Sequence, residues 1–293
     1  MTTQQATAQL SDVQDRVLDD VLVGMPYNSA SQFHEYYGTR AAPERFGASC
    51  AWQSFAAGHA VAERTGVEAD YLIDGRHVAA VYRDPECVTL LDPYLLHQRP
   101  PRLERAAAVD GEVRVTVDAY PLRVRADGSP APARMRATWL LDDDSIRLDY
   151  VRYSPRRGHN VLSRSFTLRP DVRLAAVPPP AEWVRPLLVH PEQHSVSVRV
   201  VHPDTRRMAE LILPLARAHG GAAAGASALV TKDNQGVVSA YGSAAFQRDA
   251  ELVADAVQAT EADVTAFLLE AAAIHRAVAP AGLELAAYSL EDE

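Results

Sequence analysis

Cys50, His77 and Asp92 are the residues whose types and order best suit nucleophilic chemistry. A thiol becomes a useful nucleophile at neutral pH when a histidine accepts its proton and an acid holds that histidine in the right tautomer. Each residue also has a structural explanation on its own: a small buried hydrophobe, a satisfied strand histidine and an aspartate in a turn. The catalytic hypothesis therefore depends on whether the surrounding elements bring the three together.

The segment that follows Cys50 is predicted to be a helix ending at Gly66. Its predicted buried face carries residues at positions i, i+3, i+4 and i+7: Trp52, Phe55, Ala56 and His59. Ser49 is a candidate N-cap, which places the thiol in the first turn. Unpaired backbone N–H groups and the helix dipole favour a thiolate there.

Three short strands are predicted next, over residues 68–73, 77–82 and 87–91, with turns at Asp74-Gly75 and Asp84-Pro85. If Asp84 and Pro85 form the centre of the second turn, His77 lies directly opposite Asp92. A turn one step longer on each side makes the two residues diagonal neighbours on the same face. A slip of one residue would put them on opposite faces.

The remaining sequence predicts an α+β fold. A first helix is expected from the capping-box pair Ser11 and Gln14 to about Gly24, followed by a loop with one short helix up to Phe46. Alternating runs predict an antiparallel sheet or small barrel. They span residues 113–117, 122–124, 135–140, 146–150 and 161–168.

A proline-rich linker is expected over residues 170–192, followed by four strands and two helices. The strands are expected at residues 196–201, 208–213, 228–231 and 237–241, and the helices at 249–257 and 261–278. Thr260 and Asp263 should cap the last helix. The predicted organisation is a helical region with the nucleophile (1–66), an antiparallel β-barrel or sheet with His and Asp (67–170), and an α/β lid region with closing helices (171–293).

Composition narrows the classes of function. With 293 residues and 47% hydrophobic residues, the chain can bury a sizeable core. A net charge of -9 argues against nucleic acid as the main partner. The sequence has neither a signal-peptide pattern nor an apolar run of the ~20 residues that span a bilayer, so we expect a cytoplasmic protein without membrane partners.

Metal binding is not expected, because the sequence has no CxxC or HExxH motif and its ten histidines are scattered. Two cysteines cannot form a disulfide framework. Cys87 is interpreted as a core residue and His59 as packed beside Phe55. Loop positions are expected for three further histidines, His190, His194 and His202. Gly220–Gly225 lacks the lysine and hydroxyl residue of a P-loop and is predicted to connect strands.

Four more residues are candidates for the surroundings of the thiol. The backbone N–H groups of Cys50 and Ala51 could stabilise an oxyanion at the helix start. Tyr36, Tyr37 and Trp52 could line an acceptor pocket, although a place in the aromatic core explains them equally well.

Four sequence segments carry a family resemblance: Gly47-Ala-Ser-Cys50, Arg64-Thr-Gly66-Val-Glu-Ala, His77-Val-Ala-Ala-Val-Tyr and Leu90-Leu-Asp92-Pro. In this order the chain resembles the arylamine N-acetyltransferases and, more distantly, the transglutaminase-like cysteine enzymes. The resemblance covers the whole chain. It implies an N-terminal helical region with the cysteine, a middle β-barrel with His77 and Asp92, and a C-terminal sheet with a closing helix.

The resemblance implies an acyltransferase of specialised metabolism, such as antibiotic biosynthesis. The donor would be acyl-CoA or a phosphopantetheinyl thioester on an acyl or peptidyl carrier protein, with no permanently bound cofactor. The acceptor would be a small-molecule amine or an internal nucleophile, as in an amide synthase or cyclase, and the protein a monomer or homodimer. A thioester or amide hydrolase, and a non-catalytic binding or scaffold protein of the same fold, remain alternatives. The family motif Arg-Gly-Gly-aromatic does not precede Cys50, which leaves the acceptor open.

Overall fold

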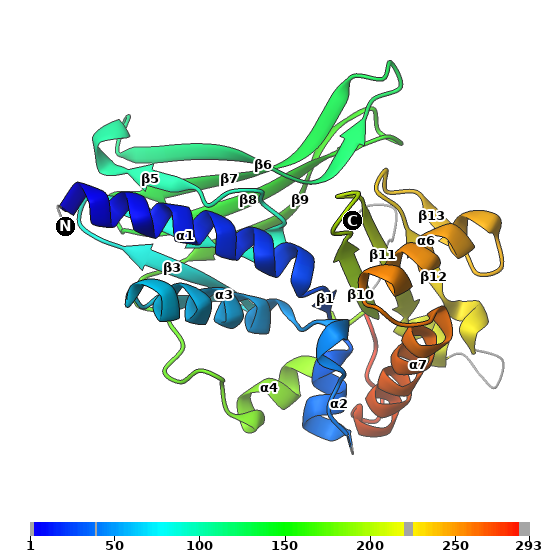
Figure 1. The fold of residues 1–293 in the computed structure, drawn as a ribbon. Helices are drawn as coiled ribbons and strands as arrows, with labels where there is room; N and C mark the ends of the chain where they lie inside the picture. The colour runs from blue at the N-terminus through cyan, green and yellow to red at the C-terminus, as the bar shows by residue number, and fades with distance from the viewer. Residues whose placement is uncertain (1–2, 39, 220–224, 287–293) are drawn as a thin grey trace. The chain divides into compact units, whose positions relative to one another are not determined.

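A computed structural model describes residues 3–38, 40–219 and 225–286 and contains both helices and antiparallel strands (Figure 1). The α+β class is thereby confirmed. The helices are α1 (Thr3–Gly24), α2 (Ser31–Tyr37), α3 (Cys50–Thr65), α4 (Ala181–Leu188), α5 (Leu215–His219), α6 (Ala244–Ala256) and α7 (Glu261–Val278). Short 3-10 turns are η1 (Glu44–Phe46), η2 (Pro93–Leu95), η3 (Arg105–Ala107) and η4 (Ala226–Ala228).

Within the described ranges, the strands form one five-stranded and two four-stranded sheets. The first four-stranded sheet contains β2 (Asp70–Asp74), β3 (His77–Arg83), β4 (Cys87–Leu91) and β5 (Arg102–Glu104). The second contains β6 (Glu112–Val124), β7 (Pro130–Leu140), β8 (Ile146–Ser154) and β9 (His159–Leu168). The five-stranded sheet contains β1 (Tyr27–Asn28), β10 (Ser195–Val201), β11 (Met208–Pro214), β12 (Val230–Lys232) and β13 (Val238–Ala240).

The chain folds into two compact units, each built from two separate segments. The first unit contains the described residues up to Leu22 together with Cys50–Pro178. The second contains Val23–Ser49 together with the described residues from Pro179 onward. These units cut across the three consecutive regions expected from the sequence, because residues 23–49 join the C-terminal sheet.

In the first unit, hydrogen bonds outside the strand ladders join the two four-stranded sheets. The segment after β9 pairs with β2, where the Leu174 N–H donates to the Tyr71 carbonyl at 2.9 Å. The connection between β4 and β5 pairs with β6, where the Tyr120 N–H donates to the Leu96 carbonyl at 3.0 Å. The two sheets of the first unit are therefore connected by hydrogen bonds at two places, which fixes one sheet relative to the other.

Helix α3 packs against strand β3 (Figure 1). The Ser54 hydroxyl donates to the Val78 carbonyl at 2.9 Å, which fixes the helix along the strand. Gly58 allows close approach, since a Cβ there would lie 2.2 Å from the Tyr71 hydroxyl. This packing sets the position of the first turn of α3, where Cys50 lies.

The turn between β3 and β4 is centred on Pro85 and Glu86, one residue later than a turn centred on Asp84 and Pro85, and the Asp84 N–H donates to the Cys87 carbonyl at 3.0 Å. Ala80 pairs with Leu91, so His77 and Asp92 are diagonal neighbours rather than directly opposite. The reason is local, because the Asp84 carboxylate accepts the N–H groups of Glu86 and Cys87, at 2.8 Å each. The same-face, diagonal relation considered from the sequence is confirmed, although the turn is displaced along the chain rather than lengthened.

Several boundaries differ from the sequence predictions. Helix α1 begins at Thr3, so Ser11 and Gln14 lie inside it and form no capping box. No glycine or proline interrupts the chain before Ser11, and the helix continues past this cap signal. Strand β6 runs through a register shift between Ala119 and Leu122 as one strand. Strand β5 and, in the linker, helix α4 had no clear sequence signal.

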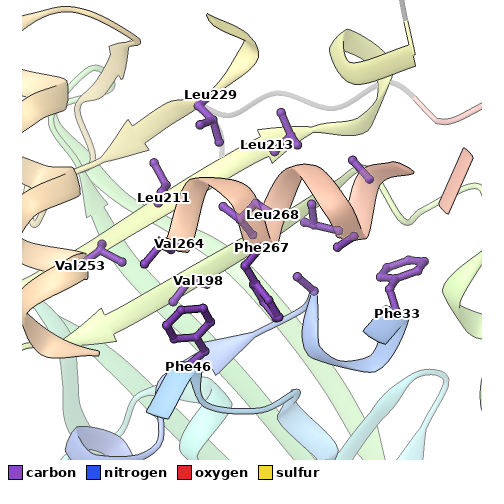
Figure 2. Close-up of a cluster of buried hydrophobic side chains, with 14 of the residues drawn as sticks. Phe33, Phe46, Val198, Leu211, Leu213, Leu229, Val253, Val264, Phe267 and Leu268 are labelled. Carbon is purple, nitrogen blue, oxygen red and sulfur yellow. The ribbon is translucent and has the colours of Figure 1, made fainter. Parts of the chain in front are cut away.

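The second unit has its own core against one face of the five-stranded sheet. Figure 2 shows side chains from the sheet, from α7 and from the segment before α3 meeting in this core. The capping box predicted for α7 is confirmed, because the Thr260 hydroxyl accepts the Asp263 N–H and the Asp263 carboxylate accepts the Thr260 N–H. Among the described residues, no helix combines the length and apolarity required to cross a membrane.

Gly58→Ala tests the contact that positions α3. Alanine favours a helix by about 1 kcal/mol over glycine, yet its methyl group would collide with Tyr71. We expect the free energy of unfolding to fall by about 1–3 kcal/mol, measured by urea denaturation.

Tyr71→Ala provides the control background. There, adding Gly58→Ala should cost less than it does beside Tyr71, because the two positions are coupled. Equal costs in both backgrounds would contradict the proposed contact.

Candidate active site

Cys50 is the first residue of α3 and is partly accessible. Ser54 lies one turn further along the same face and bonds the Val78 carbonyl, directly after His77 in the chain. The helix start and the strand start are thus held side by side. This arrangement brings the thiol of Cys50 to the imidazole of His77, and the two side chains interact.

His77 and Asp92 form a buried pair. Their side chains are 4% and 0% exposed, and His77 Nε2 lies 2.7 Å from Asp92 Oδ2. Because an ionised carboxylate only accepts hydrogen bonds, Nε2 must carry the proton in this contact. Nδ1 is then the nitrogen left for the thiol, and it makes no close, well-aligned hydrogen bond among the described residues. The pair therefore presents His77 Nδ1 as a base toward Cys50.

The electrostatics of the pair favour a protonated imidazole. Burial alone lowers the pKa of His77, but the charge and hydrogen bond of Asp92, with a smaller contribution from Cys50, raise it well above its ordinary 6.5. A proton taken from the thiol would thus be held firmly on His77.

The Asp92 side chain is available to hydrogen-bond His77 because it does not cap the following 3-10 turn. It precedes η2, yet its side chain makes no hydrogen bond to that turn. Oδ2 contacts His77, and the buried Oδ1 has no hydrogen-bond partner among the described residues. The carboxylate is therefore oriented by His77 and by its own backbone.

Two aromatic side chains hold the His77 ring. The Phe166 ring stacks on it with centroids 3.9 Å apart and 19° between the planes, and the Tyr94 ring lies at 5.4 Å. Asp74, which pairs with His77 across the β2–β3 turn, accepts the Thr167 N–H at 2.7 Å. This bond fixes β9 beside the end of β2, directly opposite His77, and helps to place Phe166 over the imidazole.

The structure brings together Cys50, His77 and Asp92, as the sequence predicted. Ala51 and Trp52 follow the thiol in the first turn of α3, where backbone N–H groups lack a carbonyl one turn earlier. The Trp52 ring lies against Phe55, at 5.2 Å between centroids. The prediction that the Ser49 side chain caps α3 is wrong, since its buried hydroxyl has no hydrogen-bond partner among the described residues.

Tyr36 and Tyr37 belong to the second unit and pack against its core. The Tyr36 carbonyl accepts from the Arg185 guanidinium at 3.1 Å, and the Tyr37 hydroxyl donates to the Arg185 carbonyl at 3.3 Å. Burial, followed by the charge of Glu35, raises the pKa of Tyr36 to about 12. These contacts account for both tyrosines within their own unit.

The other sequence candidates lie outside the triad. Cys87 starts β4 partly buried, and burial raises the pKa of its thiol, which makes it a poor nucleophile. His59 is not packed beside Phe55: its side chain is 74% exposed and pairs with Glu63, because the buried face of α3 lies elsewhere around the helix.

The three histidines predicted in loops, His190, His194 and His202, do occupy connecting segments. His190 accepts the Glu192 N–H, and His202 Nε2 donates to Asp255 at 2.8 Å directly after β10. No cluster of metal-ligating side chains occurs among the described residues. Most of Gly220–Gly225 lies outside the part of the chain that the structure describes.

Sequence reasoning missed the residues that support the triad. Phe166 was predicted on a strand, but nothing in its neighbourhood links it to His77. Ser54 and His97 give equally little signal, because their roles come from a carbonyl and an amide that the fold brings near. Comparison of the chain with protein-family models, curated proteins and solved structures finds no match.

Asp92→Asn tests the electrostatics. With the carboxylate charge removed, burial is no longer outweighed, and the pKa of His77 should fall from above 6.5 to below it. An NMR titration of the imidazole in both proteins measures this change.

Asp92→Asn should also change how the free energy of unfolding depends on pH. Since the pKa of His77 is raised on folding, its protonation stabilises the folded state fully up to about pH 6.5 and no longer above the raised pKa. The difference in unfolding free energy between wild type and Asp92→Asn should therefore shrink as pH rises through that pKa. A difference that does not vary with pH would contradict the charge pair.

Proposed function

We propose that this protein is a cysteine-dependent acyltransferase that accepts an acyl group from a thioester onto Cys50. The observation that carries the proposal is the buried His77–Asp92 pair, whose free Nδ1 is directed to the thiol at the start of α3. A purely structural role for His77 does not require a thiol beside it. A nucleophilic role for Cys50 does require a nearby base, and His77 can supply it.

In the first step, His77 Nδ1 accepts the thiol proton, and the Cys50 sulfur attacks the carbonyl carbon of the donor thioester. The carbonyl oxygen becomes an oxyanion. When the tetrahedral intermediate collapses, the C–S bond to the donor breaks and its thiolate takes the proton from His77. The products are acyl-Cys50 and a free donor thiol, so the protons balance.

In the second step, an amine or an internal nucleophile of the acyl chain attacks acyl-Cys50. His77 Nδ1 accepts the proton of the attacking group, and the C–S bond to Cys50 breaks. Passing that proton back to sulfur regenerates the thiol and the neutral base. Water in place of the amine would give hydrolysis by the same route, so the acceptor decides between transferase and hydrolase.

The oxyanion would be stabilised by the backbone N–H groups of Cys50 and Ala51. Both lie in the first turn of α3, where the helix supplies no intrahelical acceptors for such groups and its dipole favours negative charge. Donors fixed in this way need little reorganisation during the reaction. Trp52 next to them is suited to contact the acyl group.

The proposal includes a fold family within the α+β class, the arylamine N-acetyltransferase-like fold. The order of the site residues resembles that of the arylamine N-acetyltransferases. Cys50 lies at the start of a helix, His77 on the second strand after it, and Asp92 at the end of the following strand. We infer an acyl-CoA or a carrier-bound phosphopantetheinyl thioester as donor, and a role in specialised metabolism. A binding or scaffold protein of the same fold is the competing function.

Intact-mass spectrometry with acyl-CoA and with an acyl-carrier thioester tests the proposal. Wild-type protein should gain the mass of one acyl group, and the thioester that supplies it identifies the donor class. Cys50→Ala should gain none, and His77→Ala should react roughly 10²–10⁴-fold more slowly, since it lacks the general base.

Cys87→Ala is the matched control and should acylate like wild type. Iodoacetamide near neutral pH should also label Cys50 much faster than Cys87, whose pKa is raised by burial. Slow labelling of both thiols at equal rates, with no acyl adduct, would favour the binding protein instead.

A further inference from the structure

We propose that His97 is a positioning residue that holds the backbone of Asp92 and thereby aims the Asp92 carboxylate at His77. This proposal rests on the proposed function for its catalytic meaning. Its structural basis is independent of any substrate.

Only one oxygen of Asp92 is hydrogen-bonded among the described residues. Oδ2 contacts His77, whereas Oδ1 is buried without a partner. A carboxylate with both oxygens bonded would be held by its side-chain contacts. Here the direction of the carboxylate must come largely from the backbone of Asp92.

That backbone leaves the ladder at Asp92, because β4 ends at Leu91. The Asp92 N–H therefore has no strand partner, and it donates instead to His97 Nε2 at 3.0 Å. His97 Nδ1 in turn donates to the Arg99 carbonyl at 2.9 Å. These two bonds assign His97 as the neutral tautomer with its proton on Nδ1.

The position of His97 is itself fixed by the fold. It is fully buried and forms an isolated bridge with Ala119 of β6. The Gln98 N–H donates to the Asp118 carbonyl at 2.9 Å beside that bridge. Leu96 adopts a left-handed φ of 58° after η2, which turns the chain back toward Asp92. A non-glycine residue in this region is held there by its surroundings.

His97 is suited to remain neutral. Burial lowers its pKa, and Asp92 is the charged side chain that acts on it. A proton on Nε2 would face the Asp92 N–H and abolish the bond. His97 thus differs from His77 in role: one histidine moves a proton, and the other keeps an acceptor in place.

Two conservative substitutions separate the two hydrogen bonds of His97. Gln carries an amide oxygen near the position of Nε2, so His97→Gln can keep the acceptor for Asp92. Asn carries its amide near the position of Nδ1, so His97→Asn can keep the donor to Arg99 but not the acceptor. His97→Leu removes both groups while filling a similar volume.

The experiment follows the His77 imidazole by NMR titration and the rate of Cys50 modification by iodoacetamide across pH. His97→Gln should behave like wild type. His97→Asn and His97→Leu should lower the pKa of His77 and slow modification roughly 10- to 100-fold, because the carboxylate is no longer aligned. Equal pH profiles in all four folded proteins would assign His97 a purely structural role and overturn the proposal.

A measurement on wild type covers the case in which His97→Asn does not fold. ¹⁵N NMR of the imidazoles should find His97 Nε2 unprotonated at neutral pH, and a proton on Nε2 would overturn the proposal. Neither readout needs acyl transfer. If no thioester acylates Cys50, the proposed function fails, while the titrations still decide the role of His97.

Discussion

The buried charge pair of His77 and Asp92 is the interaction on which the first unit depends. Removing two ionisable groups from water is costly unless they pair in good geometry, and breaking such a pair from one side typically costs about 3–5 kcal/mol. The two side chains are 4% and 0% exposed, and 2.7 Å separates their contacting atoms. Strand register, the β3–β4 turn and the stack of Phe166 on His77 all have to agree for this pair to form.

Helix α3 carries Cys50, the third residue of the site, and is positioned by contacts of its own. Its position is set by the bond from Ser54 to Val78 and by the close approach at Gly58, neither of which involves the charge pair. Cys50 and His77 are consequently placed by different contacts on the same strand. A site built in this way rests on regular elements rather than on loops, which favours a fixed geometry.

The sequence contained enough information for the local part of the site. The alternation of β3 and β4 indicated that His77 and Asp92 share a face, and the helix start at Cys50 was clear from spacing. The exact register was not predictable, because it depended on the Asp84 carboxylate, which accepts the Glu86 and Cys87 N–H groups and stabilises a turn centred one residue later, on Pro85 and Glu86. Phe166, Tyr94 and His97 could not be assigned from sequence, since their contacts arise where distant segments meet.

The interleaved connectivity of the two units has a consequence for synthesis. The segment from Val23 to Ser49, which directly precedes Cys50, contains β1, and β1 pairs with β10. On the ribosome that partner emerges only after the whole first unit. Strand β1 must therefore wait for β10, while the charge pair and α3 can already form. The order of translation thus allows the surroundings of Cys50 to form before the segment that precedes it has joined its sheet.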